Sequence, residues 1–225
     1  MTRFPERHKV PEFSIFTSLL RMTTKYGFSN VRGQLVEDLK IAYPTKWDDF
    51  TSAKVLGEDI FGSPKPHPNA VLKLLETQKV RFAIPFAAYR ASIGGFGALM
   101  SDKPGTVLPR RSLASTIQGM HGLSTLYSNA ARMVAYGGSL RVCSDKACAL
   151  SVGTKNKAGR AEASEKVYLA MIDNREGGLL VPPALKPLLC TECAKHVEES
   201  HATQSLLIWE KLPSLFHLSH GWDDL

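Results

Sequence analysis

The first 142 residues of this 225-residue chain contain no cysteine, and no apolar run in the chain approaches the length of a membrane span. A helix needs about 20 apolar residues to cross a bilayer, so we expect no membrane-spanning helix. Residues 1–13 are charged and broken by proline, and they lack the apolar centre of a secretory signal. We therefore expect an intracellular protein, cytoplasmic or nuclear, whose cysteines stay reduced.

Acidic residues are scarce between residues 101 and 160, where Asp102 and Asp145 stand against nine lysines and arginines. With nine of the 28 basic and two of the 21 acidic residues lying here, the rest of the chain is balanced and this segment carries the net charge of +7. Such a segment can be a solvated helix face, can meet an acidic partner or can bind nucleic acid. We expect the solvated face, because charge on a helix most often points to water.

The common signatures of catalysis are also missing. Residues 94–97 are rich in glycine, but no Gly-Lys-Ser/Thr follows them and no strand is expected before them. We therefore expect a loop there and no phosphate-binding site. His121 is interpreted as a surface residue of a helix, and no Ser/His/Asp or Cys/His arrangement can be identified. The sequence predicts a protein that is not an enzyme.

Apolar residues at helical spacing are abundant. Residues 12–43 predict a helical hairpin in which Gly27 ends the first helix and Ser29 caps the second. Further helices are expected from about Pro68, from about Pro85, and over residues 111–136, 160–173 and 191–211, with Pro213 stopping the last one. Gly119 and Gly122 weaken the 111–136 helix by about 1 kcal/mol each. Segments that alternate apolar and polar residues are rare, so strands should be scarce, and the one candidate lies near residues 139–143.

All four cysteines lie in the last 83 residues, as two close pairs. Four residues separate Cys143 from Cys148, and two separate Cys190 from Cys193. Two such pairs can complete a tetrahedral site of four thiolates, the composition typical of structural zinc. Because four protein ligands leave no open position for water or substrate, this kind of site argues against catalysis. The sequence predicts a structural Zn²⁺ that ties the end of the 111–136 helix to the start of the last helix, with Cys193 in its first turn.

Other interpretations of the cysteines stay open. Four reduced cysteines can pack as small apolar residues. Cys190 and Cys193 also have the spacing of a redox pair, although no βαβ unit is expected around them. His196, three residues after Cys193, can replace one cysteine as a ligand, and His201 is a weaker substitute.

These patterns predict a mainly α fold, an irregular helical bundle with a small C-terminal zinc knuckle of four cysteines and little or no sheet. Three segments are expected. Residues 1–45 form a helical hairpin, residues 46–140 a helical region, and residues 141–225 the zinc-knuckle region with the long C-terminal helix.

Several of these segments carry a family resemblance. Residues 189–193, with Cys190 and Cys193, residues 208–218, with Trp209 and Pro213, and residues 221–225 resemble the C-terminal region of BTB/POZ-domain-containing proteins of mushroom-forming basidiomycete fungi. Cys143 and Cys148 match the upstream cysteine pair of that family. Residues 16–45 are similar to the helices that follow its BTB fold, and residues 85–89 to a helix of its middle region.

The resemblance implies that a BTB fold would lie before residue 1, so the chain would correspond to the C-terminal half of such a protein. One departure concerns the last helix, where Glu198 and Glu199 stand in a region that carries several arginines in the family. That departure weakens an acidic-partner role for this helix.

We expect a non-enzymatic protein-interaction module that is stabilised by zinc and binds a protein of unspecified identity. The alternative is a basic, zinc-containing nucleic-acid-binding protein. It is less favoured because residues 101–160 show no recognition-helix signature and few aromatics for stacking. No oligomeric state is predicted.

Overall fold

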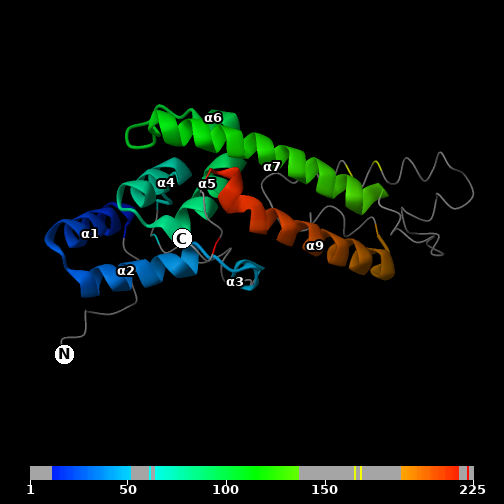
Figure 1. Ribbon diagram of the computed structural model, residues 1–225, viewed down its shortest axis with the longest axis horizontal. Coiled ribbons are helices and arrows are strands. Elements are labelled where there is room, and N and C mark those ends of the chain that lie inside the picture. The colour runs from blue at the N-terminus through cyan, green and yellow to red at the C-terminus, as the bar shows by residue number, and fades with distance from the viewer. Residues whose placement is uncertain are drawn as a thin grey trace, which may run out of the picture. The chain divides into compact units, whose positions relative to one another are not determined.

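The computed structural model describes residues 12–51, 61, 64–136, 165, 168, 189–217 and 222 (Figure 1). Within these residues the secondary structure is helical and no strand occurs, which confirms the mainly α fold. The candidate strand near residues 139–143 lies outside them, as does most of the expected helix over 160–173, of which Glu165 and Tyr168 are helical.

The chain divides into two compact units. The first comprises Met1–Gly119 together with Leu212–Leu225, and the second comprises Met120–Lys211. The three segments expected from the sequence stay a prediction.

The N-terminal helices α1 (Phe13–Tyr26) and α2 (Ser29–Ala42) pack against one another as the predicted hairpin (Figure 1). Gly27 ends α1 in the left-handed conformation, with φ of 71°, and its N–H bonds to the carbonyl of Thr23. This is the glycine C-cap that the sequence predicted. The buried side of the hairpin carries Phe16, Leu20, Leu35 and Leu39.

The prediction that Ser29 caps α2 is wrong. Ser29 is the first residue of the helix, and Phe28 stands at the cap position without a side-chain cap. The turn is held instead by backbone bonds. The N–H of Phe28 bonds to the carbonyl of Thr23 at 3.0 Å, and the N–H of Ser29 bonds to the carbonyl of Gly27 at 2.8 Å. A two-residue turn that bonds back to α1 thus starts α2.

The centre of the first unit is built on two helices that carry a proline in their first turn, close to the predicted starts. Pro68 opens α4 and Pro85 lies in the first turn of α5, where a missing N–H costs nothing. The ring of Phe86 lies 5.6 Å from that of Phe50 and 6.0 Å from that of Tyr43. The elements of this region are α3 (Trp47–Thr51), α4 (Pro68–Thr77), a 3₁₀ turn (Arg81–Ala83), α5 (Ile84–Ile93) and α6 (Gly95–Leu99).

The loop expected at residues 94–97 is wrong for residues 95–97, which belong to a short helix, α6, that follows Gly94. The amide nitrogen of Asn69 donates to the carbonyls of Ala98 and Leu99, at 3.2 and 3.1 Å. The last carbonyls of a helix have no partner within it, so this buried side chain satisfies what a short glycine-rich helix leaves open. Asn69 lies 29 residues before Ala98 and 30 before Leu99, so no local sequence pattern could have shown this contact.

The two long helices are α7 (Arg110–Tyr136) and α9 (Thr191–Leu215). α7 matches the predicted helix over residues 111–136. The prediction that Pro213 stops α9 is wrong. The helix continues through Pro213 to Leu215. A proline in the last turn removes one backbone bond, and the N–H of Phe216 still bonds to the carbonyl of Leu212 at 3.2 Å. The carbonyl of Phe216 also accepts the Ser115 hydroxyl at 2.7 Å, which holds this end in place.

Candidate metal centre

Two of the four predicted zinc ligands lie at the start of α9. Cys190 immediately precedes the helix, and its carbonyl accepts the N–H of Ala194 at 2.8 Å. Cys193 is the third residue of the helix, in the first turn, as predicted. The two cysteines are three residues apart, the spacing of neighbours on a helix surface. Both are half-buried.

The start of α9 suits thiolate ligands. The first N–H groups of a helix point outward and carry a partial positive charge, which favours an anion beside them. A thiolate is the form of cysteine that binds zinc, and helix N-termini favour it over the thiol. The local chemistry at Cys190 and Cys193 therefore fits half of a zinc site.

Cys143 and Cys148 lie outside the described residues. Among the residues that the structure describes, no three histidine, cysteine or acidic side chains converge closely enough to hold a metal. A metal bound by Cys190 and Cys193 would thus take its remaining ligands from elsewhere in the chain. The four-cysteine site stays a prediction.

His196 lies one turn after Cys193 and is half-buried. Its Nε2 atom is buried and has no hydrogen-bond partner among the described residues. His196, Cys190 and Cys193 do not form a three-ligand group, since none occurs in the described part of the chain. Replacement of a cysteine by His196 stays a prediction.

His201 is buried in the same helix, and its Nδ1 atom lies 3.2 Å from the Ser205 hydroxyl. Burial lowers the pKa of His201 to about 4, so the ring is neutral at pH 7. The buried side chains of the same helix include Val197 and Ile208. His201 therefore packs among apolar side chains with one ring nitrogen bonded to Ser205. These surroundings argue against His201 as a zinc ligand.

A carboxylate that the sequence did not single out lies in the first unit. Glu76 of α4 is partly buried, and its Oε2 atom accepts the Ser112 hydroxyl of α7 at 2.6 Å. Burial raises the pKa of Glu76, and the bond from Ser112 partly opposes that rise. No local signal distinguished Glu76 from a solvated helix residue, because its burial depends on α7, 36 residues later.

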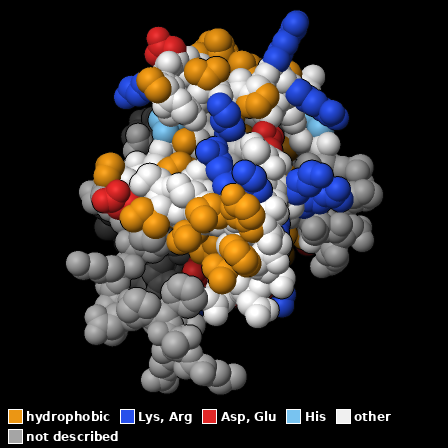
Figure 2. Space-filling model, turned by 90° about the vertical axis from the view of Figure 1, so that its left-hand side faces the viewer, with side chains coloured by type: hydrophobic (Ala, Val, Ile, Leu, Met, Phe, Trp, Pro, Cys, Tyr) orange, Lys and Arg blue, Asp and Glu red, His pale blue; other side chains and the backbone are white. Residues whose placement is uncertain are grey.

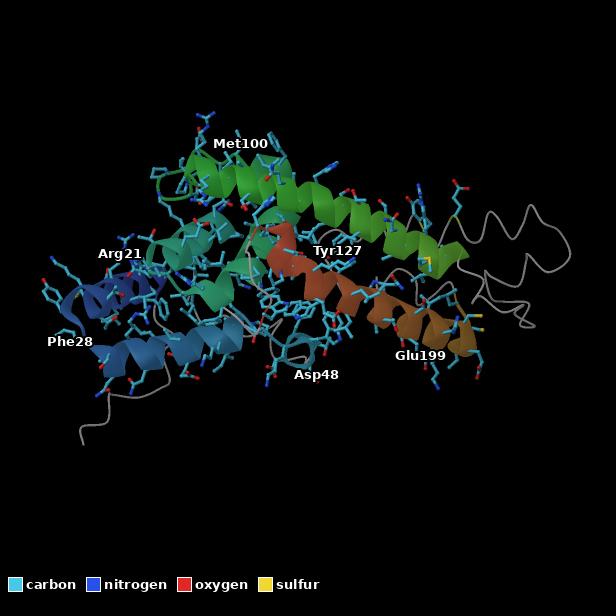
Figure 3. The ribbon with its side chains drawn as sticks, viewed as in Figure 1. Arg21, Phe28, Asp48, Met100, Tyr127 and Glu199 are labelled. Atoms are coloured by element: carbon cyan, nitrogen blue, oxygen red, sulfur yellow. The ribbon has the colours of Figure 1, made fainter. Side chains whose placement is uncertain are left out.

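Other residues considered from the sequence are solvated. His121 is exposed on α7, in agreement with its interpretation as a surface residue. Glu198 and Glu199 are exposed on α9, where Figure 3 shows Glu199. The basic side chains of the described part of 101–160 are all exposed, which fits a solvated face: Lys103, Arg110, Arg111 and Arg132.

Comparison with protein-family models, curated proteins and solved structures finds no match for this chain. None of the helices in the described part of the chain has the length and apolar character needed to cross a membrane.

Proposed function

We propose that this protein is a non-enzymatic protein-interaction module whose C-terminal region is held together by structural zinc at Cys143, Cys148, Cys190 and Cys193. The zinc part is supported by the two half-buried cysteines that share the start of α9. When bound, the metal would cross-link segments far apart in sequence, and its binding free energy would contribute to folding.

The interaction role is carried by large apolar side chains that lie exposed at the end of the α1–α2 hairpin. Met22, Tyr26 and Phe28 are each more than half exposed. Monomeric soluble proteins seldom gather such side chains in one place, and a patch of this kind commonly marks a contact with another molecule. The resemblance to the C-terminal half of fungal BTB/POZ proteins is consistent with an interaction role.

Zinc content tests the metal part. The full chain, purified without added metal, is expected to contain about one zinc per chain by elemental analysis. Chelation should release the metal and lower the melting temperature. A preparation without zinc, whose melting is unchanged by chelator, would remove the metal from the proposal.

The interaction part needs a separate measurement. Affinity capture with the zinc-loaded chain, followed by quantitative mass spectrometry, should enrich a defined protein in near-stoichiometric amount. A folded, zinc-loaded chain that enriches no protein would contradict the interaction role.

A second candidate is a nucleic-acid-binding protein, favoured by the exposed basic residues near the start of α7. Lys103, Arg110 and Arg111 stand there with Asp102 as the adjacent acid. Phosphate contacts release counterions, so binding to duplex DNA through these three residues should weaken about 40-fold between about 50 and 200 mM salt. Fluorescence anisotropy with labelled duplex checks this, and weak, salt-independent retention would exclude it.

A further inference from the structure

The α1 patch comprises four residues of α1 and one residue of the turn that follows. Their exposed fractions are Ile15 51%, Leu19 39%, Met22 51%, Tyr26 58% and Phe28 55%. Figure 2 views the side of the structure on which the α1–α2 turn lies, and it shows hydrophobic side chains gathered there with lysine and arginine side chains beside them. Figure 3 shows Phe28 at the turn and Arg21 on α1.

The four helical members of the patch recur at intervals of four, three and four residues. At 100° per residue they fall within an arc of about 60°, and at 1.5 Å per residue they extend for about 17 Å. α1 buries a different side within the fold, through Phe16, Leu20 and Thr23. The helix therefore has two apolar faces, of which one is buried in the fold and the other carries the spacing of a helix–helix seam.

The patch is held in a fixed shape. The hydroxyls of Thr23 and Thr24 donate to the carbonyl of Leu20, and the left-handed Gly27 closes the helix. The rings of Tyr26 and Phe28 lie 6.2 Å apart across the turn. A surface that is already ordered loses little conformational entropy when it binds.

Positive charge borders the α1 patch. Arg21 and Lys25, one turn apart and exposed, are the charged residues of α1, which has no acidic residue. The Lys25 ammonium lies 5.2 Å from the centroid of the Tyr26 ring. Arg32, one turn beyond Phe28, donates to the carbonyl of Gln78 at 3.2 Å, which brings the exposed Lys79 to the same end of the hairpin.

We propose that the α1 patch binds an amphipathic helix of a partner protein whose apolar seam is flanked by Asp and Glu. The proposal rests on the interaction role above and adds the surface and the chemistry of the partner. The seam spacing matches anchors of a helix that repeat every three or four residues, and the basic border complements acidic flanks.

Other occupants fit less well. In a symmetric dimer formed through this patch, each copy would bring the same basic residues, Arg21 and Lys25, and α1 has no acidic residue to pair with them. A helix that lies on a membrane pairs its apolar face with a polar face rich in lysine and arginine, whereas the polar side of α1 carries Arg21 and Lys25 among serines and threonines. Phosphate groups of a nucleic acid would face an apolar centre.

The test uses the full, zinc-loaded chain and three fluorescein-labelled synthetic helices of about 18 residues. One has leucines at seam spacing flanked by glutamates, the second has lysines in place of the glutamates, and the third is a scrambled acidic sequence. Anisotropy should show micromolar binding of the first peptide and at least about tenfold weaker binding of the other two. Equal binding of the lysine-flanked peptide would overturn the proposal.

Matched variants locate the site. Tyr26→Ser combined with Phe28→Ser, and separately Arg21→Glu combined with Lys25→Glu, should each weaken binding about tenfold. Controls are Phe96→Ser, whose ring is 56% exposed on α6, and Lys195→Glu, exposed on α9. The controls should bind as the parent does. All these side chains are exposed, so unchanged melting curves will show that the variants fold.

Two further measurements separate the other occupants. The first is co-sedimentation with phosphatidylcholine–phosphatidylserine vesicles. If the chain sediments with them and the Tyr26→Ser/Phe28→Ser variant does not, the patch binds a membrane. Concentration-dependent dimerisation abolished by the same variant would assign it to a second copy. Either result overturns the proposal. If a captured protein still binds both double variants, the chain is an interaction module that uses a different surface.

Discussion

The ring of Phe216 packs directly against Gly119, at a point of α7 where a Cβ atom would overlap the ring. One turn earlier on the same helix, the hydroxyl of Ser115 donates to the carbonyl of Phe216 at 2.7 Å. From the sequence Gly119 was expected only to weaken a helix. In the structure its missing side chain leaves the space in which the end of α9 is held.

Substitution of Gly119 by alanine should therefore destabilise the protein despite the better helix propensity of alanine. Forcing one methyl group into a filled space costs about 1–3 kcal/mol, and displacement of Phe216 would strain the Ser115 bond as well. Urea denaturation at pH 7 measures the loss.

The matched control is Gly33→Ala in α2, where an added Cβ meets nothing within 4 Å. This substitution should stabilise the protein by about 0.5–1 kcal/mol, because glycine in a helix loses more backbone entropy than alanine. If both alanine variants shift the denaturation midpoint alike, the close contact at Gly119 is wrong.

His201 makes stability depend on pH. Burial lowers the pKa of His201 to about 4, so the unfolded chain binds a proton more readily than the folded one between pH 6.5 and about 4. Stability is thus fully present above pH 6.5 and is lost as the pH falls towards 4, by roughly 3 kcal/mol. Thermal melts across this range measure the slope.

His201→Gln should flatten that slope. Some slope should persist in His201→Gln, because burial and nearby Lys103 lower the pKa of His67 as well. An unchanged slope in His201→Gln would show that this ring is protonated alike in the folded and unfolded chains.

Glu76→Gln should raise stability at neutral pH. Burial raises the pKa of Glu76, so this carboxylate favours folding at low pH and loses that contribution as the pH rises through its folded value. Glutamine keeps an acceptor for Ser112 and removes the charge. Since the side chain is only partly buried, the gain should be a few tenths of a kcal/mol.

The control for this effect is Glu37→Gln, which breaks an exposed ion pair with Lys40. It should change stability little and in the unfavourable direction. Chemical denaturation at pH 4 and pH 7 separates the two variants, because the gain from Glu76→Gln should shrink at pH 4. A gain that is equal at both pH values would argue against a charge effect.

Cysteine substitutions decide the ligand set. Cys190→Ser and Cys193→Ser should each reduce bound zinc well below one per chain and cost several kcal/mol of stability, because loss of a thiolate ligand removes metal-coupled folding. His196→Gln should keep its zinc if four cysteines bind the metal. A colorimetric zinc assay on unfolded protein gives the stoichiometry, and loss of zinc from His196→Gln would make this histidine a ligand.

Three signals that act within a few residues were predicted correctly. Gly27 at the end of α1, Pro68 at the start of α4 and Pro85 in the first turn of α5 each work through their own backbone. One local signal failed, because the cap expected at Ser29 is replaced by backbone bonds of the turn. The other two failures involve distant partners. Asn69 binds the end of α6, the helix that contains residues 95–97. Ser115 of α7 binds Phe216, just after α9 has passed Pro213.

The candidate site was predictable to a similar extent. Spacing identified the cysteine pairs and placed Cys193 in the first turn of its helix, which the structure confirms. The α1 patch was missed because the helical spacing of apolar residues over 12–43 predicted only that a hairpin forms there. Periodicity shows that a helix is amphipathic, but it does not distinguish the face that is buried in the fold from the face left to solvent.

The bond between Ser115 and Phe216 spans 101 residues, and both ends belong to the first unit. During synthesis, a chain that has grown to Gly119 has every helix of the N-terminal region but lacks the ring that fills the space beside that glycine. The first unit is completed only when residues 212–217 emerge, after the whole of the second unit has been made. A chain interrupted before that point leaves this part of α7 uncovered and open to chaperones and proteases.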